Sequence, residues 1–510
     1  MASEQQVLAT WILIVVYMAV IMFFVIRGAL KIKDLSDYAV GNISFSPVSV
    51  GLALAASMTS AATFIINPGF IALYGISGIL SFAIVMPLAI FASLIIFTKG
   101  FRKHGSKVKA LTMAQWIGSR FGSKQYALFF ACISILLVTF IVLICVGLTQ
   151  VLASSLNLEP FWVLFGIVGF VFGYMMFGGA NSMVYTNTIQ ACLMIVVAVI
   201  LLGSGYEHFS LGIDHFMSKL SSIDKHFASW TNPESFLFRD YFEIVFCQIV
   251  IGIAIVCQPH IITKSLLLKN DKDVNRYLLV GIVVELLFFL VVIAGLYARL
   301  AFPDLIVNGQ ALKMDGIISA YVVKRFPVYI GIIVVMGLIS AGLSTLEGLI
   351  QSLSSTFTSD LIKPLFSKFF KGNRDRLEVT VNKLVIIVLA IVSFILSYDQ
   401  IKNPNLSVAI FAQNGVYAYF AAAFVPVLFG TFFKDVPLYA VFSASAVALI
   451  VHFSIYYGNL TAYMQEPVNN PAIAATFAIL SSVGVGLVLI FLSRRAYTKS
   501  TTVVSQNPVS

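Results

Sequence analysis

Thirteen apolar segments follow one another along the chain, and they constrain its fold more than any other feature. A helix of about 20 apolar residues crosses the hydrocarbon core of a bilayer and satisfies its own backbone hydrogen bonds there. The composition agrees, because 59% of the residues are hydrophobic and only 11% are charged. The pattern therefore predicts an all-α integral membrane protein. The expected spans are residues 7–26, 45–75, 77–98, 125–152, 160–178, 181–204, 241–266, 277–301, 328–356, 380–399, 405–431, 436–457 and 470–493.

The distribution of positive charge predicts the orientation of these spans. Of the 32 Lys and Arg residues, 24 fall in the loops and the tail on one side of the expected bundle. Positively charged loops face the cytoplasm, and an odd number of spans places the two termini on opposite sides. We therefore expect an N-terminus outside, a C-terminus in the cytoplasm, and a location in a plasma membrane, with a bacterial inner membrane favoured.

Several classes of protein are disfavoured. The net charge of +10 would suggest a nucleic-acid partner in a soluble protein, but here it reflects orientation in a lipid bilayer. We find no HExxH, GxSxG or GxxxxGK[ST] motif, which argues against an enzyme and against an ATP-driven pump. The five Cys residues lie in apolar segments without CxxC spacing, so we expect neither a disulfide framework nor a metal cluster.

Two spans contain helix breakers at corresponding positions. Span 45–75 carries Asn67-Pro68-Gly69 beside a cluster of hydroxyl residues, and span 241–266 carries Gln258-Pro259-His260. Interrupted spans at matching positions of two halves are typical of a transporter binding site. Since the two lie five spans apart, they predict two five-span repeats. The expected organisation is 1–44 (first span and cytoplasmic loop), 45–204 (first repeat), 205–240 (extracellular loop), 241–431 (second repeat), 432–496 (two C-terminal spans) and 497–510 (cytoplasmic tail).

A break inside a span leaves backbone carbonyls free to bind a cation, and a hard ion such as Na⁺ prefers oxygen ligands. Span 328–356 offers hydroxyl partners, because Ala341, Ser344 and Thr345 recur at helical spacing on one face. Glu347 borders that face, and an acid within a span is a functional candidate by default. The alternatives are that the hydroxyls only pack helices together and that Glu347 is a protonated acid bonded to a neighbouring helix.

Four motifs occur in order along nearly the whole chain: DLSDYAVGNISFSPVSVGLALAASMTSAATFIINPG, FGGANSMVYTNTIQA, QPHIITK, and AGLST followed by SSTFTSDL. They resemble those of the solute:sodium symporter family, which includes the bacterial proline, pantothenate, acetate and sialic acid carriers. The resemblance implies a LeuT-like fold of two inverted five-helix repeats. It also implies sodium-driven symport of a small organic solute by alternating access.

The same resemblance implies roles for individual residues. The family binds sodium with two carbonyls at the first break, matching Ala56 and Thr59, and with a carbonyl and two hydroxyls, matching Ala341, Ser344 and Thr345. All five residues here are suited to that role, so we expect an intact Na⁺ site.

One departure from the family concerns an acid. Many members have Asp where this chain has Asn187, and Glu347 stands where members often have a small or polar residue. We hypothesise that the carboxylate has moved to Glu347, so that Asn187 and Glu347 mark a second cation site or a proton site.

The solute is constrained less closely. The proline carriers have Trp and Tyr where this chain has Ile251 and Ile255, and the middles of the core spans contain no Lys or Arg. We therefore expect a small neutral, zwitterionic or monocarboxylate solute, such as a pantothenate-like compound or an amino acid. The expected substrate contacts are Ser60, Thr63, Asn67, Gln248, Ile251, Ile255, Gln413 and Asn414.

Two alternatives to symport are a transporter-like membrane sensor and a sodium-independent uniporter. The intact hydroxyls of Ser344 and Thr345 argue against the uniporter. The sequence leaves the oligomeric state open, a monomer included.

Overall fold

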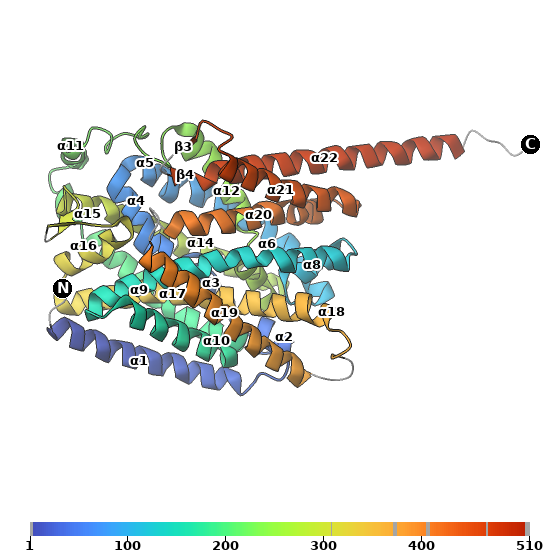
Figure 1. Cartoon of the computed structure of the whole chain (residues 1–510), viewed down its shortest axis with the longest axis horizontal. Coiled ribbons are helices and arrows are strands. Elements are labelled where there is room, and N and C mark those ends of the chain that lie inside the picture. Colours follow the sequence, from blue (N-terminus) through green and yellow to red (C-terminus); the bar gives the residue numbers. More distant parts are fainter. Residues whose placement is uncertain (1–3, 308, 371–374, 404–407, 466–467, 505–510) are drawn as a thin grey trace, which may run out of the picture.

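The computed structural model describes residues 4–307, 309–370, 375–403, 408–465 and 468–504 as a bundle of helices that run mostly side by side (Figure 1). Helix α1 begins at one end of the bundle, and α22 runs out beyond the opposite end (Figure 1). The long helices are α1 (Glu4–Ala29), α6 (Met86–Val108), α9 (Val138–Leu156), α10 (Pro160–Gly203), α14 (Val274–Leu290), α17 (Val328–Thr356), α19 (Asp375–Lys402), α20 (Val408–Phe432), α21 (Leu438–Gly458) and α22 (Pro471–Val504).

Shorter elements extend or connect these helices. Helices α5, α8, α15 and α18 continue into or from a long neighbour. The two small hairpins and the other short helices lie in connections. The short helices are α2 (Leu35–Val40), α5 (Ile76–Ile79), α7 (Met113–Arg120), α8 (Lys124–Ile133), α11 (Ile213–Ile223), α15 (Ala294–Ala301), α16 (Ile317–Arg325) and α18 (Lys363–Leu365). The antiparallel hairpins pair β1 (Ile306–Val307) with β2 (Gln310–Ala311) and β3 (Met464–Gln465) with β4 (Val468–Asn469).

Ten helices in the described part of the chain are long and apolar enough to cross a membrane, and two bent pairs raise the number to as many as 12. The all-helical membrane architecture predicted from the sequence is thus confirmed. The predicted count of 13 spans requires α10 to supply two crossings, and it stays a prediction.

Helix α10 reverses direction at Gly179, where the backbone adopts φ 56° and ψ −164°. A straight 44-residue helix would be about 66 Å long, roughly twice the hydrocarbon thickness of a bilayer. Tyr174 before Gly179 and Gln190 after it both bond the same carboxylate, that of Glu347. Those two positions would lie about 24 Å apart on a straight helix. The two arms of α10 therefore lie beside one another.

The first bent pair joins α3 (Pro47–Met58) to Ala62–Tyr74, a π-helical turn over Ala62–Ile66 followed by α4 (Asn67–Tyr74), at an angle of 56°. The sequence offered Asn67-Pro68-Gly69 as the helix breaker, but the helix does not unwind there. The family resemblance placed the carbonyls of the break at Ala56 and Thr59, and Thr59 is where the helix ends. The break covers Thr59–Ala61, and the helix after it is continuous through Asn67. Pro68 lies in the first turn of α4, where a missing N–H costs little, and the π-helical turn before it accommodates the ring.

The second bent pair joins Phe242–Ile255, which includes α12 (Gln248–Ile255), to Pro259–Leu267, which begins with α13 (Pro259–Ile262), at 59°. Here the break falls at Val256–Gln258, directly before Pro259, where the sequence predicted it. Gln258 is extended, because a residue before proline avoids the helical region.

The reversal in α10 generates a testable prediction. In Gly179→Ala the new methyl group would lie 2.9 Å from the Tyr38 carbonyl oxygen, and the backbone conformation is one that glycine almost alone adopts. We expect a loss of about 1–3 kcal/mol in the free energy of unfolding, measured as a lower melting temperature of the purified protein. Gly173→Ala is the matched control, because an added Cβ meets nothing within 4 Å. Equal stability of both variants would contradict this account of the reversal.

Candidate functional site

The break after α3 exposes backbone carbonyls inside the protein. Helix α3 ends at Met58, and Thr59 leaves the helical region with φ −89° and ψ 98°. The last carbonyls of a helix have no partner within it. In this position they are buried, since Ala56 and Thr59 are completely shielded from solvent. These oxygens must therefore find partners on other elements.

Helix α17 supplies those partners. The Ser344 hydroxyl donates to the Ala56 carbonyl oxygen at 2.7 Å. The Thr345 hydroxyl lies 3.4 Å from the Thr59 carbonyl oxygen and 3.1 Å from that of Ser57. Both hydroxyls also approach the Ala341 carbonyl oxygen, at 3.1 and 3.4 Å. The structure thus brings all five residues of the expected Na⁺ site together, and Ser57 is a neighbour that sequence reasoning missed.

This cluster has the chemistry of a site for a small hard cation. Carbonyl and hydroxyl oxygens are the ligands that such ions prefer, and five residues of α3 and α17 contribute them without any formal charge. Ala341, Ser344 and Thr345 are fully buried, like the two residues at the break. A cation bound among these oxygens would replace the hydroxyl-to-carbonyl hydrogen bonds that now join the two helices.

Asn187 and Glu347 lie near this cluster in different settings. Asn187 donates through Nδ2 to the Ser57 hydroxyl at 3.0 Å, and that hydroxyl donates to the Ser344 carbonyl oxygen at 3.3 Å. Glu347 faces both arms of α10, where its carboxylate accepts from Tyr174 and Thr186 at 2.6 Å each and from Gln190 at 3.0 Å. Asn187 is therefore linked to the oxygen cluster, whereas Glu347 is held by three donors.

A cavity of about 100 Å³ lies beside the break. Five of the eight expected substrate contacts line it, namely Ser60, Thr63, Asn67, Ile255 and Gln413. No Lys, Arg, Asp or Glu side chain is among its lining residues. The cavity therefore offers neutral hydrogen-bonding groups on an otherwise apolar wall.

Three expected substrate contacts do not line this cavity. Gln248 and Ile251 lie one to two turns before the second break, where α12 packs within the bundle. Asn414 points to α21 instead: its Nδ2 donates to the Tyr457 hydroxyl at 2.9 Å, and its Oδ1 lies 2.9 Å from His452 Nε2. Its amide thus joins two helices, and a polar residue in a span often has that role.

Two further polar residues of the cavity come from the QPH motif at the second break. Gln258 and His260 both line the cavity. Gln258 Oε1 and His260 Nδ1 are buried and have no hydrogen-bond partner among the described residues. The helix breaker was recognised in the sequence, but the direction in which its neighbours point was not.

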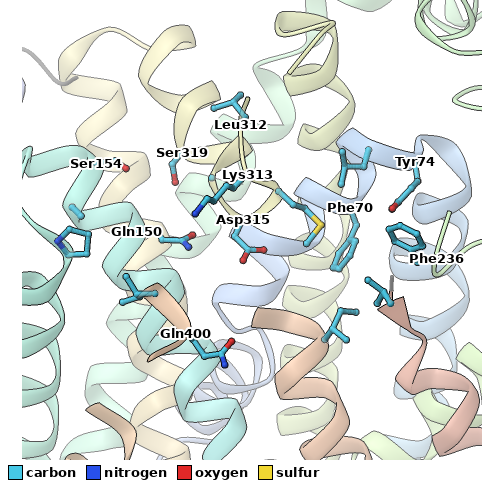
Figure 2. A pocket seen from close by; sticks show the side chains of 18 of the residues that line it. Phe70, Tyr74, Gln150, Ser154, Phe236, Leu312, Lys313, Asp315, Ser319 and Gln400 are labelled. Atoms are coloured by element: carbon cyan, nitrogen blue, oxygen red, sulfur yellow. The ribbon is translucent and has the colours of Figure 1, made fainter. Parts of the chain in front are cut away.

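A larger pocket of about 670 Å³ lies farther along α4 (Figure 2). Figure 2 shows Phe70 and Tyr74 on one side of it and Gln150, Lys313 and Asp315 on the other. Helix α4 contributes to both spaces, since Asn67 lines the small cavity and Phe70 lines the large pocket. The two spaces therefore follow one another along the same helix.

Comparison with known proteins agrees with this geometry. A family model described as "Sodium:solute symporter family" matches residues 38–447. The chain belongs to the sodium:solute symporter family. It is thus a membrane transporter rather than an enzyme, and it couples solute import to sodium.

Relatives within the family differ in the solutes that their names give. The chain is 25% identical to a sodium/pantothenate symporter of Haemophilus influenzae, over 81% of this chain and 83% of that protein. It is 24% identical to a monocarboxylic acid transporter of Corynebacterium glutamicum, over 75% and 72% of the two chains. It is 22% identical to a high-affinity proline transporter of Bacillus subtilis, over 78% and 81%.

A solved structure shows the same fold. The structure of a Na⁺-coupled sialic acid symporter in a substrate-bound outward-open state superposes with a TM-score of 0.78 and 18% identity. The match covers 95% of this chain and 97% of that one. The family and this match establish the LeuT-like fold that the sequence motifs implied.

The setting of Glu347 generates a prediction about this symporter. In Glu347→Gln an amide replaces a carboxylate that accepts three hydrogen bonds, so at least one donor loses its acceptor. We expect the free energy of unfolding to fall by about 1–3 kcal/mol, measured as a lower melting temperature. Glu159→Gln, at an exposed acid directly before α10, is the control and should change stability by less than about 0.5 kcal/mol.

The same variant tests the hypothesis of a second cation or proton site at Asn187 and Glu347. Uptake by proteoliposomes is measured as a function of Na⁺ and of pH. If Glu347→Gln shows the same Na⁺ and pH dependence as the parent protein, Glu347 belongs to neither kind of site.

Proposed function

We propose that the transported Na⁺ binds between α3 and α17, at the carbonyl oxygens of Ala56, Thr59 and Ala341 and the hydroxyls of Ser344 and Thr345. The observation that carries this proposal is the convergence of all five residues, each fully buried, on one cluster of oxygens at the helix break. Their neutral oxygen chemistry suits a hard monovalent cation.

We further propose that the solute binds in the small cavity beside the break and is neutral, zwitterionic or a monocarboxylate. The absence of charged side chains from the cavity's lining residues supports this, because a multiply charged anion would have no counter-charge. Pantothenate, monocarboxylic acids and proline, which the relatives' names give, all carry at most one carboxylate. The expected contacts are Ser60, Thr63, Asn67, Ile255 and Gln413, with Gln258 and His260 added by the geometry.

The coupling would run through adjacent residues. The Thr59 carbonyl oxygen belongs to the cation cluster, and Ser60, the next residue, lines the solute cavity. A cation that fixes Thr59 therefore also fixes one wall of the solute site, and this raises the affinity for solute. One Na⁺ gains about 2.3 kcal/mol per 100 mV of membrane potential, and each tenfold concentration ratio adds about 1.4 kcal/mol.

The alternating access expected of this site would use the two breaks. They lie in residues 45–204 and 241–431, which we propose as the two repeats, and their bends of 56° and 59° are similar. With the N-terminus outside and the C-terminus in the cytoplasm of a bacterial cell, the large pocket of Figure 2 would be the outer entrance.

Ligand-induced thermal stabilisation tests this function. The melting temperature of the purified protein is measured in Na⁺ and in K⁺ with pantothenate, short monocarboxylates, amino acids, sugars and sialic acid. A ligand that binds the folded state stabilises it by an amount that grows with the logarithm of its concentration. We expect a hit among the first three classes, seen in Na⁺ and lost in K⁺. A hit of equal size in both ions would contradict sodium coupling at this site.

The proposed cation ligands are tested by Ser344→Ala and Thr345→Ala, each of which removes one hydroxyl from the cluster. We expect each variant to reduce the Na⁺-dependent stabilisation and to shift the Na⁺ dependence of uptake to higher concentration by at least about tenfold, which corresponds to about 1.4 kcal/mol. Ser352→Ala is the control, because its hydroxyl bonds the Leu349 carbonyl of the same helix and lies outside the cluster. Retention of the parent's Na⁺ dependence in both variants would exclude the site.

A further inference from the structure

A second carboxylate lies on the other side of the first break. Glu285 belongs to α14 and is fully buried. Its Oε2 accepts a hydrogen bond from the Thr59 hydroxyl at 2.8 Å. Its Oε1 is buried and has no hydrogen-bond partner in the described part of the chain. Thr59 therefore faces the α17 cluster with its carbonyl oxygen and faces Glu285 with its side chain.

The packing of α14 against α3 holds Glu285 in this position. Gly51 of α3 lies so close to α14 that an added Cβ would come within 2.8 Å of the Tyr277 carbonyl oxygen. Farther along, the rings of Phe64 and Phe288 pack edge to face with centroids 5.5 Å apart. These contacts lie before and after Glu285, and they hold α14 against α3 on one side of the break and against the π-helical turn on the other.

Glu285 differs from the other fully buried Glu residues in the described ranges. Glu243 is paired with Arg239 at 2.5 Å and accepts from Asn470 at 2.8 Å. Glu347 accepts from three donors. Glu285 has one hydrogen bond, and no Lys, Arg or His of the described residues forms an ion pair with it. A buried carboxylate without a counter-charge is costly. A bound cation would supply the positive charge that no side chain provides at this site.

We propose that Glu285 and the Thr59 hydroxyl bind a second monovalent cation, separated from the α17 cluster by the backbone of Thr59. This inference rests on the proposed sodium coupling and adds a second ion to it. The ligands are a carboxylate and a hydroxyl, both hard oxygen donors that suit Na⁺. Because Thr59 takes part in both sites, a cation at either site orders a ligand of the other. The two ions therefore bind cooperatively, and two ions enter with each solute.

The number of bound ions is measurable from stability in the full-length, purified protein. The melting temperature is followed over roughly a hundredfold range of saturating Na⁺, with choline keeping the ionic strength constant. In this range the slope against the logarithm of the Na⁺ concentration is proportional to the number of ions that the folded state binds. We expect Glu285→Gln to halve the slope of the parent protein, and Thr59→Val to do the same. Thr59→Ser keeps the hydroxyl and should keep the full slope.

Each outcome bears on a different claim. A slope in Glu285→Gln equal to that of the parent overturns the second site, and the α17 cluster stands if Ser344→Ala still reduces the slope. A parent protein that shows no Na⁺ dependence at all refutes the proposed function itself. If Glu285→Gln does not fold, the matched pair Thr59→Val and Thr59→Ser decides, and equal slopes in that pair overturn the proposal. In proteoliposomes the number of Na⁺ ions carried per solute is obtained from the reversal potential. It should be two for the parent and one for Glu285→Gln.

Discussion

The carbonyl oxygens at the end of α3 have no partner in their own helix, and the rest of the site depends on how that shortage is met. The hydroxyls of Ser344 and Thr345 meet it from one side. On the other side of the break, the carboxylate of Glu285 accepts a hydrogen bond from the Thr59 hydroxyl. The solute cavity begins at the next residue, Ser60. Helices α3, α14 and α17, together with the proposed cation and solute sites, thus meet at a few backbone groups that have no partner within their own helix.

Much of this arrangement follows from the sequence. Long apolar segments require membrane helices, and the spacing of Ala341, Ser344 and Thr345 predicts one face of α17. The helix-breaking residues alone did not give the position of the first break, because Pro68 fits the first turn of α4 and the unwinding occurs earlier, at Thr59–Ala61, next to the carbonyls that the family resemblance indicated. A proline signals that a helix has a boundary nearby, but tertiary packing decides on which residue the boundary falls.

The polar residues of the spans show the same limit of prediction from sequence, because their contacts depend on tertiary packing. Asn414 and Gln413 are adjacent amides, yet one bonds to α21 and the other lines the cavity. Composition and periodicity identify such residues but not the direction of each side chain, since that depends on how neighbouring helices cross. Glu285 is the clearest case: its partner Thr59 lies 226 residues away along the chain, and no local pattern connects the two.

The three donors that hold Glu347 also bear on which parts of the symporter can move. Tyr174 comes from one arm of α10 and Thr186 from the other, and both are tied to α17 through the same carboxylate. A tilt of α17 must carry both arms with it or break these hydrogen bonds in a dry interior, where their groups would find no water as a replacement. We therefore expect helix α17 and the α10 hairpin to move together, so that the hinges of the proposed alternating access would lie in the bent helices that pack against α17.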